Sequence, residues 1–134
     1  MIGYTMVGVS NLDRAGAFYG PLFKEMGYDE CYRDAQVVSW GGRADETVPR
    51  FFAGKPFDGA PASVGNGAMT AFLIDDPKRI DRCYAHAMRS GGSDEGAPGF
   101  RPQYGPGFYA AYVRDPDGNK IAFTCYDAPP DPSA

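Results

Sequence analysis

The order of predicted elements repeats along the chain, and this repeat constrains the fold more than any other feature. Residues 2–9 alternate as a strand does, and a helical stripe of apolar residues and three strand-like segments follow. Beyond a stretch rich in Gly, Pro and Ser, the order of strand, helix and strands begins again. One such half exposes a sheet face that it cannot cover alone, so we expect the halves, or two chains, to pair.

These boundaries predict a single domain over residues 1–128. Its first module spans 1–55, a linker spans 56–67, and its second module spans 68–128. The proline-rich tail at 129–134 is expected to be frayed.

Local signals predict where the elements begin and end. Ser10 and Asp13 have the spacing of a capping box, so the first helix is expected to start there. Asp76, followed by proline, predicts the start of the second helix. Residues 93–107 are rich in loop formers, and Asp-Pro-Asp-Gly at 115–118 predicts a tight turn between the last two strands.

Strand alternation assigns side chains to two faces of each sheet. If Arg114 pairs with Asn119 across the last turn, one face suits the helices; it carries Val7, Phe72, Tyr112, Ile121 and Phe123. The other face mixes small, aromatic and hydroxyl groups; it carries Tyr4, Met69, Tyr109, Ala111, Ala122 and Thr124. Such a mixture is typical of a small-molecule cavity. A packed interior of mixed composition is the alternative.

Composition excludes several classes of protein and site. The net charge is −4 and no basic stripe appears, which argues against nucleic-acid binding. No apolar run approaches the roughly 20 residues of a membrane helix, and no signal peptide is apparent, so we expect a cytoplasmic protein. The single histidine, His86, excludes metal sites that need two histidines, and its helical position predicts exposure to solvent. The three cysteines lack Cys-x-x-Cys spacing; Cys83 and Cys125 are predicted core thiols, and the role of Cys31 stays open.

Two segments carry a resemblance to a known family. Val9–Tyr19 contains Leu-x-x-Ala-x-x-Phe-Tyr, and Tyr109–Ile121 contains Asp-Pro-Asp-Gly-Asn. Together they resemble the vicinal oxygen chelate superfamily, also called the glyoxalase, bleomycin-resistance and dioxygenase superfamily. Residues 65–72 and 96–102 are similar to a bacterial subgroup of it. The resemblance implies an α+β fold of two βαβββ modules, whose curled mixed sheets surround a cavity.

Enzymes of that family hold a divalent metal with His and Glu side chains on the cavity face. In this sequence the corresponding positions are Tyr4, Met69 and Ala122. None of these is a ligand for a hard or borderline divalent cation. We therefore expect neither a metal nor another cofactor.

The resemblance also implies which residues border the cavity. The long loop would bring Arg101 and Tyr104 to its mouth, although a solvated loop is the alternative. Apart from the resemblance, Trp40 on a strand of the first half would offer a wall for a flat ligand, with a core tryptophan as the alternative. The predicted ligand-binding set is Tyr4, Met6, Trp40, Met69, Ala71, Arg101, Tyr104, Tyr109, Ala111, Ala122 and Thr124. No catalytic residue is assigned.

The sequence is compatible with three functions. The first is a metal-free protein that binds a small, partly apolar molecule in an aromatic-lined cavity. The second is a lyase, isomerase or dioxygenase of the same superfamily with non-standard catalytic residues. The third is a structural or partner-binding protein whose cavity is filled by side chains. A homodimer is expected in each case, because the family buries sheet edges and faces between chains.

Overall fold

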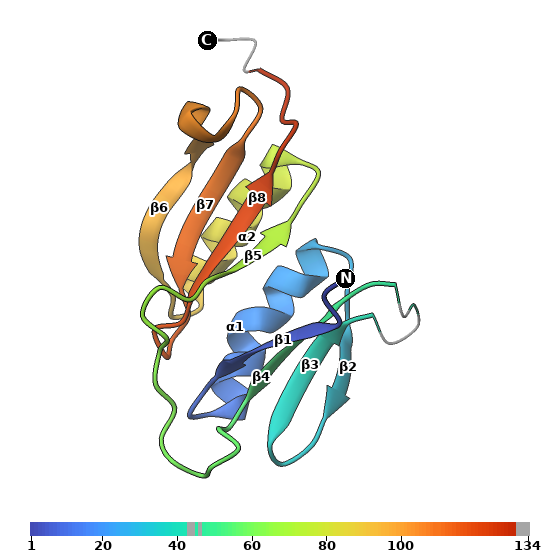
Figure 1. Ribbon diagram of the computed structural model, residues 1–134, viewed down its shortest axis with the longest axis vertical. Coiled ribbons are helices and arrows are strands. Elements are labelled where there is room, and N and C mark those ends of the chain that lie inside the picture. The colour runs from blue at the N-terminus through green and yellow to red at the C-terminus, as the bar shows by residue number, and fades with distance from the viewer. Residues whose placement is uncertain (43–44, 46, 131–134) are drawn as a thin grey trace.

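The chain folds into two βαβββ modules that follow one another in sequence (Figure 1). The computed structural model describes residues 1–42, 45 and 47–130, so residues 131–134 of the expected frayed tail lie outside the described part. The first module consists of β1 (Tyr4–Gly8), α1 (Leu12–Glu25), β2 (Glu30–Arg33), β3 (Val37–Gly41) and β4 (Arg50–Gly54). The second consists of β5 (Thr70–Leu73), α2 (Pro77–Arg89), β6 (Ser93–Phe100), the short 3₁₀ helix η1 (Pro102–Tyr104), β7 (Tyr109–Arg114) and β8 (Lys120–Cys125).

Each module contributes one four-stranded mixed sheet. The strand orders are β1-β4-β3-β2 and β5-β8-β7-β6, so the two sheets have the same topology. In each sheet the first strand pairs in parallel with the last, and the other neighbours are antiparallel. The predicted α+β fold of two βαβββ modules is confirmed, with both sheets left open. Within the described residues, neither helix is long and apolar enough to cross a membrane.

One hydrophobic core joins the two modules. α1 turns its apolar stripe toward β3 and β4, and the ring of Phe23 stacks on Trp40 with 5.2 Å between centroids. Phe72 of the second module meets both Phe23 and Phe51 at 5.2 Å. Burial of each such side chain stabilises the fold by roughly 1.5–3 kcal/mol. The helices contact each other on one side of the molecule, which leaves the opposite face of each sheet free of helices.

The turn between β7 and β8 fastens the second module to the first. The Tyr19 hydroxyl on α1 donates to Asp115 Oδ2 at 2.7 Å, and Asn119 Nδ2 donates to the Gly8 carbonyl at 2.8 Å. Asp117 Oδ1 accepts from the backbone N–H and the hydroxyl of Ser10. Burial, followed by the charge of Asp115, raises the pKa of Tyr19 well above its ordinary value. The turn predicted from Asp-Pro-Asp-Gly is therefore also a contact between modules.

This contact explains a small error in the predicted start of the first helix. The N-cap of α1 is Asn11, whose Oδ1 accepts from the Arg14 N–H at 2.9 Å. Ser10 has the residue type of a cap, but its hydroxyl is engaged with Asp117 from the other module. A long-range hydrogen bond thus displaces the local cap by one residue.

A strand occupies much of the segment that the sequence predicts as loop. β6 pairs antiparallel with β7, but its register shifts between Asp94 and Gly96 and again between Gly96 and Gly99. Gly96 has φ +157°, and a Cβ there would lie 3.0 Å from the Tyr112 ring. The glycines and bulges of β6 interrupt the alternation of side chains that normally indicates a strand.

Candidate functional site

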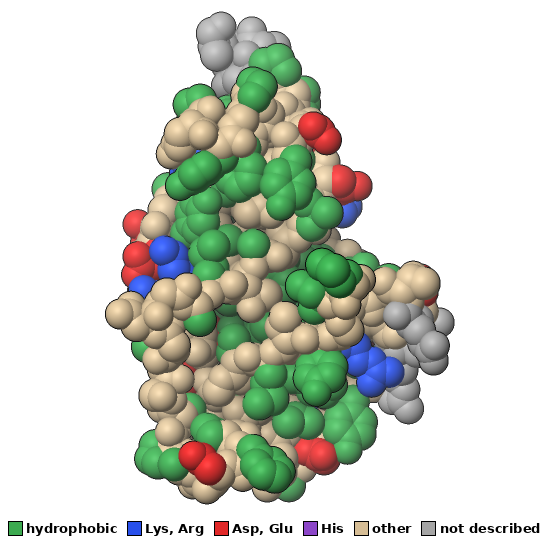
Figure 2. Space-filling model, in the orientation of Figure 1, with side chains coloured by type: hydrophobic (Ala, Val, Ile, Leu, Met, Phe, Trp, Pro, Cys, Tyr) green, Lys and Arg blue, Asp and Glu red, His purple; other side chains and the backbone are tan. Residues whose placement is uncertain are grey.

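The open face of the second sheet carries an aromatic groove of about 720 Å³. Its floor comes from β7 and β8, and its rim comes from β6, the segment around η1 and the chain after β8. The lining residues are Met69, Glu95, Gly96, Arg101, Gln103, Tyr104, Phe108, Tyr112, Lys120 and Tyr126. Figure 2 shows apolar side chains gathered over the second sheet, with charged groups at the border. We call this feature the second-sheet groove.

The register of β7 and β8 decides which residues face this groove. Arg114 pairs with Lys120 instead of the expected Asn119, so Tyr112 lies opposite Ala122. A shift of one residue moves side chains to the other face of a strand. Tyr112 therefore faces the groove, and the prediction that Tyr109 shares the cavity face is wrong.

The turn itself causes this shift. The Asp115 N–H donates to the Asn119 carbonyl, and Asp115 Oδ1 accepts from the Asn119 N–H, each at 2.9 Å. Asn119 thus closes the turn as its last residue, and pairing in the ladder begins one residue later. The sequence motif predicts the turn but not that its asparagine belongs to it.

Two cations lie against the ring of Tyr112. The Arg101 guanidinium carbon is 5.6 Å from the ring centroid, and the Lys120 ammonium nitrogen is 5.7 Å from it. Such distances permit cation–π attraction. Tyr104 and Phe108 meet edge to face at 5.4 Å, and Phe108 lies 5.7 Å from Tyr126. The groove therefore combines an aromatic surface with two positive charges.

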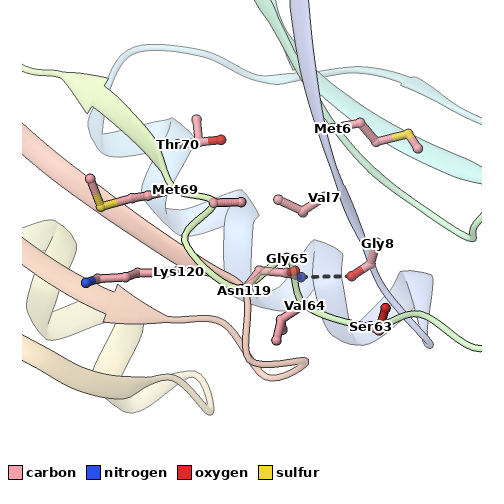
Figure 3. Close-up of a pocket in the computed structure, with 11 residues that line it drawn as sticks. Met6, Val7, Gly8, Ser63, Val64, Gly65, Met69, Thr70, Asn119 and Lys120 are labelled. Atoms are coloured by element: carbon pink, nitrogen blue, oxygen red, sulfur yellow. Dashed lines mark hydrogen bonds between the residues drawn. The ribbon is translucent and has the colours of Figure 1, made fainter.

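A smaller pocket of about 230 Å³ lies at the junction of the modules. It is bounded by β1, the linker around Val64 and Gly65, and the starts of β5 and β8. Figure 3 shows the hydrogen bond from Asn119 to Gly8 at its base, and Met69 and Lys120 extending side by side away from Met6. Met69 and Lys120 line both this pocket and the second-sheet groove.

The remaining predicted site residues are divided between core and surface. Trp40 and Ala111 lie in the packed core, and the Tyr109 hydroxyl donates to Asp81 of α2 at 2.6 Å. These three side chains are directed toward the helices, contrary to the expectation that they line the cavity.

The other predicted residues lie on the strands. Ala122 and Thr124 are buried on β8 beside the groove, whereas Ala71 is exposed on β5. Tyr4 is 69% exposed on β1 and lines neither of the two pockets.

Seven of the ten lining residues fall outside the predicted ligand-binding set: Glu95, Gly96, Gln103, Phe108, Tyr112, Lys120 and Tyr126. Tyr112 was assigned to the helix-facing side because of the register error. Phe108 and Tyr126 flank β7 and β8 just outside the strands, where alternation gives no signal. The clustering of Phe and Tyr on both sides of this hairpin is the signal that could have found them.

The residues at the family's metal positions do not fit a divalent cation. Tyr4 offers an exposed phenol, Met69 a half-exposed thioether, and Ala122 a buried methyl group. In the described part of the chain, no group of three or more His, Cys, Asp or Glu side chains is arranged to hold a metal ion. The donors that a hard or borderline cation prefers are thus missing from these positions.

The histidine and the thiols lie away from the groove. His86 is half-buried, not solvent-exposed as expected, and its Nε2 lies 3.4 Å from Glu25 Oε1 across the helix pair. Cys83 and Cys125 are buried as predicted, and burial raises the pKa of the Cys83 thiol to about 12. The Cys31 Sγ lies 3.6 Å from the Ser39 hydroxyl.

The fold is similar to that of 138 solved chains. One is a glyoxalase/bleomycin resistance protein from Albidiferax ferrireducens, with 32% identity, 92% of this chain and 97% of that chain covered, and a TM-score of 0.82. A glyoxalase-related enzyme from Fulvimarina pelagi has 17% identity, with 93% and 87% covered and a TM-score of 0.70. A lactoylglutathione lyase from Agrobacterium tumefaciens has 23% identity, with 93% and 92% covered and a TM-score of 0.64.

At 17% and 23% identity, the second and third of these structures are similar to this chain in fold alone. The first is similar in sequence as well, over nearly its whole length. The sequence matches no family model and no curated protein.

Proposed function

The chain belongs to the glyoxalase/bleomycin resistance protein family, and we propose that it binds a small, partly apolar molecule in the second-sheet groove without a metal. The observation that carries this proposal is the groove itself, whose volume of about 720 Å³ is within the range of small-molecule sites. Its aromatic rings offer flat apolar contact, and its polar lining side chains are Glu95, Arg101, Gln103 and Lys120. The unsuitable side chains at Tyr4, Met69 and Ala122 support the metal-free part of the proposal.

The exposure of the rim supports the same function. Tyr104 is 66% exposed and Tyr126 is 63% exposed, although both rings contact Phe108. Large rings left in water across one concave surface indicate a surface that is covered when a partner binds. The ring faces of these tyrosines would contribute most of the contact area to a flat ligand.

Calorimetric titration with cinnamyl alcohol, a flat and uncharged probe, tests this proposal. We expect binding by the wild-type chain, and a loss of affinity of up to about tenfold in Tyr104→Ala and in Tyr126→Ala. Tyr28→Ala removes a partly exposed tyrosine of the first module and serves as the control. Unchanged affinity in the double variant Tyr104→Ala/Tyr126→Ala, or no binding by the wild type, contradicts the proposal.

We also propose that the chain forms a homodimer. Tyr4 and Met6 are exposed side by side along the open face of β1, and Tyr4 packs against Phe52 of β4. Contiguous apolar side chains on a sheet face are typical of protein interfaces. Sedimentation equilibrium tests this, and Met6→Lys is expected to shift the mass toward the 14.4 kDa monomer. A wild-type chain that sediments as a monomer would exclude the dimer.

A further inference from the structure

The second-sheet groove holds more positive charge than its own acidic groups balance. Arg101 and Lys120 both line it, and neither forms an ion pair with any other residue that the structure describes. Glu95 is the one acidic residue among the described lining residues. Its Oε1 accepts from Arg114 Nε at 2.6 Å, so its charge is already compensated by a cation outside the groove.

Arg101 is held in place before any ligand arrives. Its Nη1 donates to the Gly99 carbonyl at 2.8 Å, and its Nη2 donates to the Ala97 carbonyl at 2.7 Å. Both acceptors belong to β6, in the segment where its register shifts between Gly96 and Gly99. A guanidinium has five N–H donors, so donors remain for a ligand. Because the side chain is already ordered, binding costs little further entropy.

Lys120 approaches the same ring from the floor of the groove. It is the first residue of β8, where the register places it beside Arg114 and on the same face as Ala122. Its ammonium group lies 5.7 Å from the Tyr112 centroid, as the Arg101 guanidinium does at 5.6 Å. The two cations thus lie against the same aromatic ring, next to the exposed rings of the rim.

We infer that the ligand of this groove is an organic anion, and that Arg101 and Lys120 hold its anionic group beside Tyr112 while its apolar body lies on the rim tyrosines. This inference rests on the proposed function and adds the charge of the ligand to it. A carboxylate and a phosphate share the required chemistry, since both accept paired hydrogen bonds from a guanidinium and both attract an ammonium group.

The test compares probes with one apolar body and different charge: cinnamate, cinnamyl phosphate, cinnamyl alcohol and cinnamylamine. Calorimetry on the full chain is expected to show at least one anion binding about tenfold more tightly than the alcohol, and the amine more weakly. Lys120→Met and Arg101→Lys are each expected to reduce this preference severalfold, and Lys120→Met/Arg101→Gln to abolish it. Added salt should weaken binding of the anions and leave the alcohol unaffected.

Lys78→Met is the matched control, because it removes one positive charge from an exposed position on α2, away from the groove. It is expected to leave every affinity unchanged. The thermal midpoint of each variant reports whether a change at Arg101 disturbs β6. If it does, Lys120→Met still tests the inference, because Lys120 lies on β8. Equal affinity for cinnamate, cinnamyl phosphate and the alcohol overturns the inference while the proposed function stands. Failure of all four probes to bind overturns both, and the relative affinity of the two anions identifies the anionic group.

Discussion

The two sheets share one topology but present different open faces. On the first sheet the open face is largely apolar, with Tyr4, Met6 and Phe52, and its outer strand β2 has four residues. The corresponding strand of the second sheet, β6, has eight residues and leads into η1. The added segment supplies part of the rim of the groove, and its carbonyls at Ala97 and Gly99 accept hydrogen bonds from Arg101. The difference shows that one short extension can convert a plain sheet face into a site while the fold stays the same.

The β2–β3 turn of the first module and the β7–β8 turn of the second differ in burial. Replacing the aspartate of the buried turn should have the largest effect on stability. Asp115 is 3% exposed and contacts Tyr19 of the other module, whereas Asp34 makes its turn contacts at the surface. Asp115→Ala is expected to lower the free energy of unfolding in urea by about 3 kcal/mol, because it leaves buried donors without an acceptor. Asp34→Ala should cause a much smaller loss. Similar losses in the two variants would contradict this view of the turn.

The helices bury different titratable groups, and this predicts a loss of stability in alkali. Burial, followed by the nearby charge of Glu25, raises the pKa of the Cys83 thiol to about 12 from an ordinary value of 9.0. The neutral thiol thus stabilises the fold fully below about pH 9, and this contribution is lost as the pH rises toward 12. The free energy of unfolding should fall with pH by up to about 1.4 kcal/mol per pH unit in this range.

Cys83→Ala is expected to flatten this alkaline slope and to leave the slope between about pH 6 and pH 8 unchanged. The slope is the quantity to compare, because loss of the side chain also lowers stability at every pH. Tyr19, whose pKa burial raises as well, keeps part of the alkaline dependence in the variant. An unaltered slope in the variant would assign the whole effect to other groups.

Basic residues at equivalent positions of the two sheets should differ in their effect on anion binding. Arg50 begins β4 as Lys120 begins β8, and each strand pairs in parallel with the first strand of its module. Lys120→Met is expected to weaken cinnamate binding severalfold, whereas Arg50→Met should change it by less than about twofold. Calorimetry with both variants measures the difference. An equal loss in both would place the anion between the sheets.

The smallest effect is expected from an aromatic residue on the first sheet. Tyr4 is as exposed as Tyr104 but lies outside the second-sheet groove. Tyr4→Ala should therefore alter the affinity for cinnamyl alcohol by less than about twofold, in contrast to Tyr104→Ala. If the two variants lose affinity alike, the ligand lies against both sheets and the first-sheet face is part of the site.

Much of the fold could be predicted from local sequence patterns. The amphipathic stripe of the first helix, the Asp-Pro start of the second and the turn at 115–118 each depend on neighbouring residues alone. β6 could not be predicted, because Gly96 and Gly99 interrupt its alternation and its partner β7 supplies the order. Most of the groove lining was also missed. Tyr112 was assigned to the wrong face because the faces of a hairpin depend on a register that the strands themselves do not specify, and Phe108 and Tyr126 lie just outside the strands.

By itself, the sequence determined the duplicated order of elements, the apolar stripe of the first helix, and the absence of ligating side chains at Tyr4, Met69 and Ala122. The tertiary structure decided the rest. It placed Asn119 in the turn, so that β7 pairs with β8 one residue away from the predicted register and Tyr112 faces the groove. The physical reason is that helices and turns satisfy their hydrogen bonds locally, whereas strand register and the meeting of Arg101 with Lys120 depend on contacts between distant segments.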